Sequence, residues 1–236
     1  MQIKVLYEDN HIIAVYKPSG VLTQGDKSGK KSLMDAVKEY IKEKYKKPGN
    51  VFLGLVHRLD KPVSGIVLFG KTSKGSARLS EQFRNHTIQK TYHGIVMGKL
   101  EKQKGEIKEK VKKISFFAKG LVGKDESELL EEIKKATKTR TAELSYEVLG
   151  SNERYSLVKI MPKTGRFHQI RIQMANLGNP VVGDIKYGAP FPLKDRSIAL
   201  SADSISFKLA TKDELKTISI PMVLDLGNIA GKISIH

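Results

Sequence analysis

The sequence predicts an α+β domain built on a mostly antiparallel sheet that is flanked by helices. Most apolar residues fall in short runs rich in β-branched and aromatic residues, which are typical of strands. Fewer segments, among them 32–45, 73–85 and 167–178, repeat apolar residues at helical spacing. The chain contains no internal repeat and no convincing linker, so we expect residues 1–236 to form a single domain.

The first half of the chain combines predicted strands with two predicted helices. The strands are β-rich runs bounded by turn residues, at 2–8, 11–17, 51–59, 65–72 and 90–98. The first two form a hairpin around the turn pair Asp9-Asn10. The helix over 32–45 begins at the N-cap Ser32 and ends before Pro48, and a second helix covers 73–85.

The second half adds further predicted strands, at 142–150, 155–162, 197–207 and 216–221. The first of these alternates apolar residues with Glu and Ser and is expected to pair antiparallel with the second. The helix over 167–178 ends at Gly178. Residues 99–119 are rich in Lys and 126–135 read as an acidic helix, so we expect residues 99–138 to be an inserted arm and helix.

The charge of the chain indicates a polyanionic partner. Lys and Arg number 42 against 25 Asp and Glu, a formal net charge of +17. Phosphates attract such a protein because their neutralisation releases counterions. Only 8 of these cations are Arg, so each Arg is a candidate for a position that needs a planar fork of donors.

Composition also excludes several classes of protein. Without Cys the chain has no disulfide, no Cys-ligated zinc and no thiol nucleophile. No apolar run approaches the ~20 residues of a membrane helix, and the N-terminus lacks a signal-peptide pattern. We therefore expect a cytoplasmic protein that makes no contact with a membrane.

Residues 65–72 match the phosphate-loop pattern G-x-x-x-x-G-K-[ST], which raises a nucleotide triphosphatase as one alternative. In a phosphate loop the residues between the glycines form a compact turn around the phosphates. Here they are Ile, Val, Leu and Phe, which are typical of a buried strand. We therefore favour a core strand over a nucleotide site at Gly65 to Thr72.

A second cluster, the residues VHRLD at 56–60, ends a predicted strand. Alternation on the strand places Arg58 and Asp60 together on the face opposite His57. An Arg and an Asp at a strand end are compatible with an active site. Taken alone, however, the pair is more typical of a surface ion pair worth less than ~1 kcal/mol, and we favour that interpretation for this cluster by itself.

A third cluster, KTGRFHQIR at 163–171, is predicted to open a helix. The free N–H groups at a helix start favour anions, so Arg166 and Arg171 there indicate a phosphate or carboxylate. The competing interpretation, a helix with charged residues facing solvent, explains Arg171 but not Gly165-Arg166. A fourth cluster, GDIKYG at 183–188, is predicted to be a structural turn.

Together these segments closely resemble the RluA-like pseudouridine synthases. The resemblance covers nearly the whole chain and rests on EDNHIIAVYKPSGVL (8–22), HRLDKPVSG (57–65), KTYHGIVMG (90–98) and TGRFHQIRIQMANLGNPVVGDIKYG (164–188). It implies the pseudouridine synthase fold, a mixed sheet with an active-site cleft across it. It also implies isomerisation of uridine in RNA, in which the bond from the ribose to N1 is replaced by a bond to C5.

The resemblance implies a role for six residues. Asp60 matches the catalytic carboxylate, which acts as nucleophile on C1′ or as base at C2′. Arg166 is our first candidate to hold Asp60 ionised and Arg171 our second. Tyr92 matches a tyrosine that stacks on the uracil and takes part in removing the C5 proton. The remaining matches lie in HRLD, where Arg58 is expected to replace the flipped base and His57 to contact the substrate or support the site.

The expected partner is ribosomal or transfer RNA, bound by a monomer. The reaction needs no cofactor, no metal and no nucleotide. The family pattern begins at about residue 3, so we expect no accessory RNA-binding domain before it. A non-catalytic RNA-binding protein on the same scaffold is a further alternative, but it would not need Asp60 beside Arg58.

Overall fold

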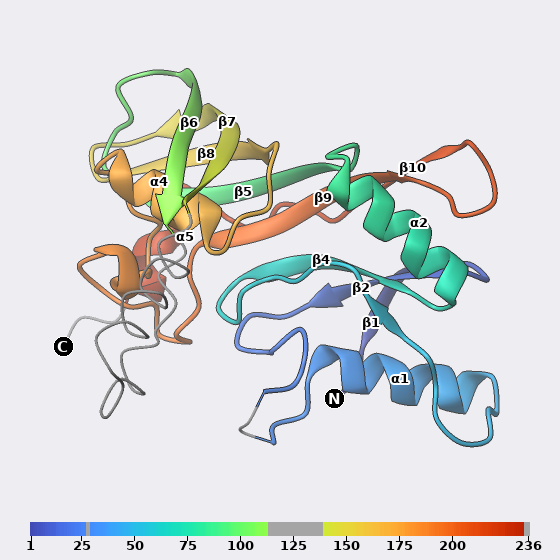
Figure 1. Cartoon of the computed structure of the whole chain (residues 1–236). Helices are drawn as coiled ribbons and strands as arrows, with labels where there is room; N and C mark the ends of the chain where they lie inside the picture. Colours follow the sequence, from blue (N-terminus) through green and yellow to red (C-terminus); the bar gives the residue numbers. More distant parts are fainter. Residues whose placement is uncertain (27–28, 113–138, 234–236) are drawn as a thin grey trace, which may run out of the picture.

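A mixed sheet of ten strands runs through the computed structural model, which describes residues 1–26, 29–112 and 139–233 (Figure 1). The strands are β1 (Lys4–Glu8), β2 (Ile12–Lys17), β3 (Gly54–Leu55), β4 (Ser64–Gly70), β5 (Gln89–Met97), β6 (Lys104–Lys112), β7 (Thr139–Ser151), β8 (Tyr155–Pro162), β9 (Leu200–Lys208) and β10 (Leu215–Ser219). Their order is β1-β2-β4-β9-β5-β8-β7-β6, with β10 on β9 and β3 on β4. Within this described part only β4 and β9 pair in parallel, so the predicted α+β class with a mostly antiparallel sheet is confirmed.

Helices cover both faces of the sheet. They are α1 (Leu33–Lys44), α2 (Ser73–Arg84), α4 (Gln169–Asn176) and α5 (Leu226–Ile229), with 3-10 turns at Ile185–Tyr187 and Ala230–Lys232. Figure 1 shows α1 and α2 on opposite sides of β2 and β4, and α4 and α5 beside β5 to β8. None of the helices in the described ranges is long and apolar enough to cross a membrane.

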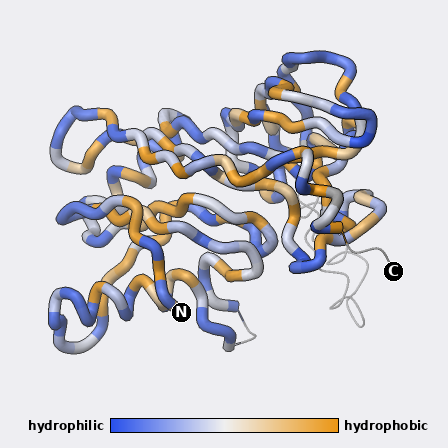
Figure 2. Tube along the Cα trace, turned by 180° about the vertical axis from the view of Figure 1, so that it is seen from behind, coloured by the Kyte–Doolittle hydropathy of each residue, from blue (hydrophilic) through white to orange (hydrophobic). Residues whose placement is uncertain are grey.

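Alternate residues of β2 and β4 pack against α1 on one face of the sheet and against α2 on the other. Ile13 and Val67 lie in the same core cluster as Leu33 of α1, whereas Ile12 and Leu68 pack with Leu79 of α2. A strand that is buried on both faces needs a continuous apolar run, which is what both strands contain. The hydropathy colours agree, because orange follows the inner strands and blue gathers in the outer loops (Figure 2).

The residues that match a phosphate loop form this buried strand. Residues 66–69 are at most 2% exposed. Gly65 has φ of 129° and lies against β9, where a Cβ would come within 2.4 Å of the backbone oxygen of Ala202. Lys71 pairs with Glu8 at 2.6 Å. The interpretation as a core strand is confirmed, and the nucleotide triphosphatase alternative is wrong.

Most predicted elements are present at their expected places. The N-terminal hairpin, the capped helices α1 and α2 and the antiparallel pair β7 and β8 are confirmed. The arm expected at 99–119 is wrong for its described part, because β6 pairs with β7 along its whole length. The acidic helix expected at 126–135 lies outside the described residues.

The strand predicted at 51–59 is largely wrong and is replaced by a break in the sheet. Only Gly54–Leu55 pairs, with the end of β4, while β9 pairs with the start of β4. Between these two neighbours the backbone N–H of Leu68 donates to Nε2 of His57 at 2.9 Å. A side chain thus replaces a backbone partner, and residues 56–60 leave the sheet and border the cavity described next.

Candidate active site

A cavity of about 880 Å³ brings the sequence motifs together. Its lining includes residues 55–60, the end of α2, Lys90 and Tyr92 of β5, Pro162 and residues 164–171. All six residues of the predicted site, Asp60, Tyr92, Arg166, Arg58, Arg171 and His57, are among them. The break between β3 and β9 therefore places these side chains at the middle of the sheet.

Asp60 is bonded to Arg171, which is itself fixed by a second carboxylate. Arg171 Nη1 donates to Asp60 Oδ2 at 3.1 Å, and its Nε and Nη2 donate to the two oxygens of Asp184 at 2.6 and 2.8 Å. The Asp184 side chain is 1% exposed and that of Asp60 is 26% exposed. Burial opposes the charge on Arg171, but the carboxylates outweigh it and raise the Arg171 pKa. Asp60 is thus held in place while remaining accessible from the cavity.

The expectation that Arg166 is the first partner of Asp60 is wrong. Arg166 Nε donates to the backbone oxygen of Thr141 at 2.9 Å. The physical reason is the start of α4, since His168 adopts a left-handed φ of 51° and the helix begins only at Gln169. Arg166 therefore precedes the helix, whereas Arg171 lies in its first turn and faces inward, 5% exposed. The solvent-facing interpretation of Arg171 is wrong for the same reason.

His168 lies beside Asp60 as a neutral ring. Its Nε2 is 3.6 Å from Asp60 Oδ2 and its Nδ1 is 2.7 Å from the hydroxyl of Tyr187. Burial, with the positive charges of Arg171 and Lys186, lowers the His168 pKa to about 4, although Asp60 and Asp184 act in the opposite direction. Because the ring is uncharged near neutral pH, its contact with Asp60 is not an ion pair.

Tyr92 and His57 line the cavity in different ways. Burial, and then the negative charge of Asp60, raises the Tyr92 pKa, so its phenol stays protonated at neutral pH. Burial, and then the charge of Lys90, lowers the His57 pKa to about 3. The neutral His57 ring stacks on Phe83 at 4.7 Å and its Nε2 holds the Leu68 amide. This geometry favours the structural interpretation of His57 over substrate contact.

Three residues that support the site were missed in the sequence. Asp184 and Tyr187 belong to the segment 183–188, predicted as a structural turn. The side chain of Asp184 makes no cap bond there and instead binds Arg171, which packs 4.9 Å from the Tyr187 ring.

The third residue is Lys17, which is completely buried. Its Nζ donates to the carbonyls of Pro18, Val21 and Lys61, next to Asp60. A Lys directly before a Pro at the end of an apolar run was the available signal.

The family model described as RNA pseudouridylate synthase matches residues 11–176. The chain belongs to this family. A Bacillus subtilis (strain 168) protein named "Uncharacterized RNA pseudouridine synthase YhcT" is 32% identical over 231 residues, covering 97% of this chain and 71% of that protein. The "Dual-specificity RNA pseudouridine synthase RluA" of Vibrio cholerae is 30% identical, covering 93% of this chain and 82% of that protein. The expected RluA-like membership is confirmed.

A solved structure confirms the pseudouridine synthase fold. Human RNA Pseudouridylate Synthase Domain Containing 4 superposes with a TM-score of 0.72 at 21% identity, covering 93% of this chain and 88% of that chain. With the family and the fold established, the enzyme class of the chain is an isomerase that converts uridine in RNA to pseudouridine.

Proposed function

We propose that this pseudouridine synthase modifies uridines in ribosomal or transfer RNA and uses Asp60 as the carboxylate that acts at the sugar. Relatives named for transfer RNA and for the large ribosomal subunit both match this chain, which supports these two classes of target. The reaction breaks the bond between C1′ and N1, turns the uracil and joins C5 to C1′. The proton lost from C5 is balanced by a proton gained at N1.

The position of Asp60 is the observation that supports the proposal. One carboxylate oxygen is bonded to Arg171, and the side chain is open to a cavity that is large enough for a nucleotide. Since Arg171 is fixed by Asp184, the carboxylate is oriented before substrate binds. Both mechanistic routes, attack on C1′ and proton removal at C2′, need such a placed, ionised carboxylate.

Tyr92 supplies a ring next to this carboxylate. Its protonated phenol is unable to accept the C5 proton, so we assign it first to stacking against the uracil. If Asp60 forms an ester with C1′, its charge disappears and the electrostatic penalty on ionising Tyr92 falls with it. Tyr92 is then better able to give its own proton to N1 of the uracil and to take the proton from C5 in its place, so that its phenol ends as it began.

Arg58 is suited to replace the base that leaves the RNA stack. It is exposed and lines the cavity next to Asp60. A uridine within a stacked helix has to be flipped out at a cost of a few kcal/mol. A planar guanidinium stacks on the neighbouring bases and lowers this cost.

The test of the proposal is release of tritium from C5 of uracil in ribosomal and transfer RNA. Wild-type protein should release tritium, and Asp60→Asn should reduce release to background because the amide neither attacks C1′ nor accepts a proton. Asp213→Asn, on the exposed β9–β10 loop, is the matched control and should keep wild-type activity. Release that persists in Asp60→Asn would rule out the mechanism. RNA binding without any release by wild type would favour the non-catalytic alternative.

Tyr92→Phe separates stacking from proton transfer. The variant keeps the ring, so we expect RNA affinity close to wild type and turnover lower by about 10²-fold or more. Single-turnover rates at saturating RNA are the measurement. Tyr155→Phe, which removes a hydroxyl in β8 outside the cavity, should leave the rate unchanged. Equal rates for Tyr92→Phe and wild type would remove the hydroxyl from the mechanism.

A further inference from the structure

We infer that Arg84, Lys90 and Arg140, the basic rim, bind backbone phosphates of the RNA strand next to the target uridine. This inference rests on the proposed function and assigns the contacts that hold the strand while its base occupies the cavity.

The basic rim is assembled from three separate elements. Arg84 is the last residue of α2, Lys90 precedes Tyr92 by two residues in β5, and Arg140 lies near the start of β7. All three line the same cavity as Asp60. A strand whose uridine reaches Asp60 therefore passes within reach of these cations.

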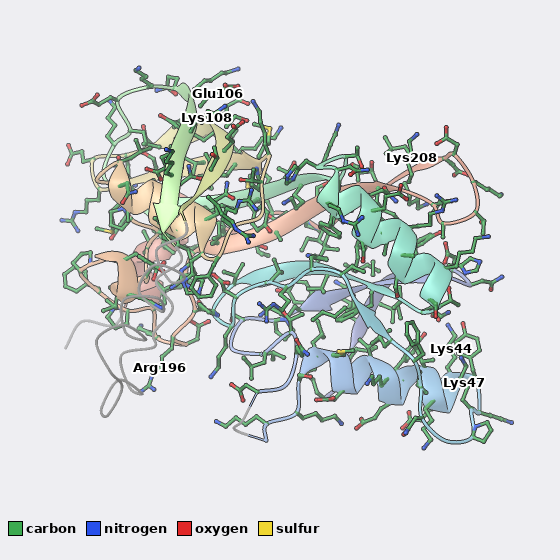
Figure 3. The ribbon with its side chains drawn as sticks, in the orientation of Figure 1. Lys44, Lys47, Glu106, Lys108, Arg196 and Lys208 are labelled. Atoms are coloured by element: carbon green, nitrogen blue, oxygen red, sulfur yellow. The ribbon has the colours of Figure 1, made fainter. Side chains whose placement is uncertain are left out.

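The rim cations have no carboxylate partner within the described ranges of the chain, which distinguishes them from many surface lysines. Lys44 pairs with Glu8 at 2.6 Å, Lys108 with Glu143 at 2.7 Å and Lys208 with Asp213 at 2.5 Å. Figure 3 shows these three lysines on widely separated parts of the surface. The carboxylate partner largely neutralises the charge of each of these lysines. The rim charge is not neutralised and is available to an anion from outside.

Lys90 is the innermost of the three cations. Its Nζ has one hydrogen bond, to the backbone oxygen of Thr164 at 3.3 Å. Protein surrounds the side chain, yet solvent still reaches it through the cavity, and burial lowers the Lys90 pKa to about 8. An ammonium group has three donors, so two remain unused here. A phosphate would satisfy these donors and return the pKa toward its usual value.

The chemistry of the three side chains favours a phosphate over a base. All three are donors that carry a positive charge, which is attracted most strongly by an anionic oxygen, and half or more of the hydrogen bonds from proteins to DNA go to phosphate and sugar. Arg84 and Arg140 are exposed at the outside of the cavity, where a strand would enter or leave. Guanidinium groups bind phosphate oxygens through two parallel hydrogen bonds. The rim is thus suited to holding phosphates on either side of the flipped nucleotide.

The test is the salt dependence of binding to a transfer RNA transcript, measured by fluorescence anisotropy. The logarithm of the binding constant falls linearly with the logarithm of the salt concentration, and each lost phosphate contact makes this fall less steep by about 1. We expect such a decrease for each of Arg84→Gln, Lys90→Gln and Arg140→Gln, with Lys90→Arg close to wild type. Arg78→Gln is the matched control, because Arg78 lies in α2, pairs with Glu81 and does not line the cavity. Unchanged slopes in all three rim variants would overturn the inference.

Tritium release distinguishes this inference from the proposed function. The rim variants should need more RNA to reach half-maximal release, with a smaller loss in the rate at saturation. A purely structural role of Lys90 would instead lower the saturating rate and leave the salt slope unchanged, which would contradict the inference for Lys90. Absence of release by wild type would refute the proposed function alone, because the slopes test the rim independently.

Discussion

At the scale of single residues, Arg171 contacts two carboxylates in different surroundings. Asp184 is buried and takes two of its hydrogen bonds, while Asp60 takes one and faces the cavity. Two donors on one carboxylate fix the plane of a guanidinium, which a single hydrogen bond does not. Asp184 therefore orients Arg171, and Arg171 in turn orients Asp60.

Asp184→Asn should expose this dependence. The amide keeps the volume but loses the charge and one acceptor, so Arg171 is free to turn further toward Asp60. We expect the single-turnover rate to fall by about 10- to 100-fold, as for a reacting group displaced by ~1 Å, with RNA affinity unchanged. Asp195→Asn, outside the catalytic cavity, serves as the control. A wild-type rate in Asp184→Asn, at equal RNA affinity, would show that Arg171 needs no second carboxylate.

The sequence was sufficient to predict that the site residues meet but not how they pair. Asp60, Tyr92 and Arg171 follow from the motifs. The choice between Arg166 and Arg171 depends on the residue at which α4 begins, and the left-handed conformation of His168 sets this start. His is among the residues enriched in that conformation, but it adopts it too rarely for the sequence to place the turn at His168, and the surrounding packing selects it.

At the scale of elements, the strand predicted at 51–59 is wrong where β4 changes its partner from β3 to β9. The apolar alternation of residues 53–59 continues past Leu55, yet pairing stops there and His57 replaces the backbone as partner of Leu68. Hydrophobic periodicity indicates which residues are buried, but it does not indicate which strand they pair with. The element beside the cavity was therefore predicted as a longer strand than exists.

The strand β6 was missed for the opposite reason. Its described residues are mostly charged, so it lacks the apolar pattern of a strand. Cross-strand ion pairs stabilise it instead, since Lys104 lies opposite Glu147 at 2.8 Å and Lys108 opposite Glu143 at 2.7 Å. Such pairs join residues far apart in sequence and become visible only when the register is known.

At the scale of the whole molecule, the two kinds of basic residue are distributed differently. Five of the eight Arg, namely Arg58, Arg84, Arg140, Arg166 and Arg171, line the catalytic cavity. Lys90 is the one Lys among the described residues that does so. The rarity of Arg in the sequence was thus informative about the site, whereas the 34 Lys account for most of the net charge. Diffuse lysine charge raises the local concentration of RNA, and the cavity arginines act on it directly.

The stability of the whole molecule should fall in mild acid because of His57. Its pKa is about 3 in the folded protein, against about 6.5 in an unfolded chain, so the unfolded state binds the proton more readily. Protonation would also break its bond to the Leu68 amide, which joins the loop to β4. The contribution of neutral His57 is therefore complete above pH ~6.5 and is lost progressively as the pH falls toward 3.

His57→Gln tests this dependence, since the amide oxygen still accepts from Leu68 but does not titrate. One proton changes the slope of unfolding free energy by at most about 1.4 kcal/mol per pH unit. Urea unfolding between pH 6.5 and 4 should give a slope for His57→Gln that is flatter than wild type by up to this amount. His86→Gln, at an exposed position on the cavity edge, should keep the wild-type slope. Parallel pH profiles for wild type and His57→Gln would mean that His57 is not held neutral by the fold.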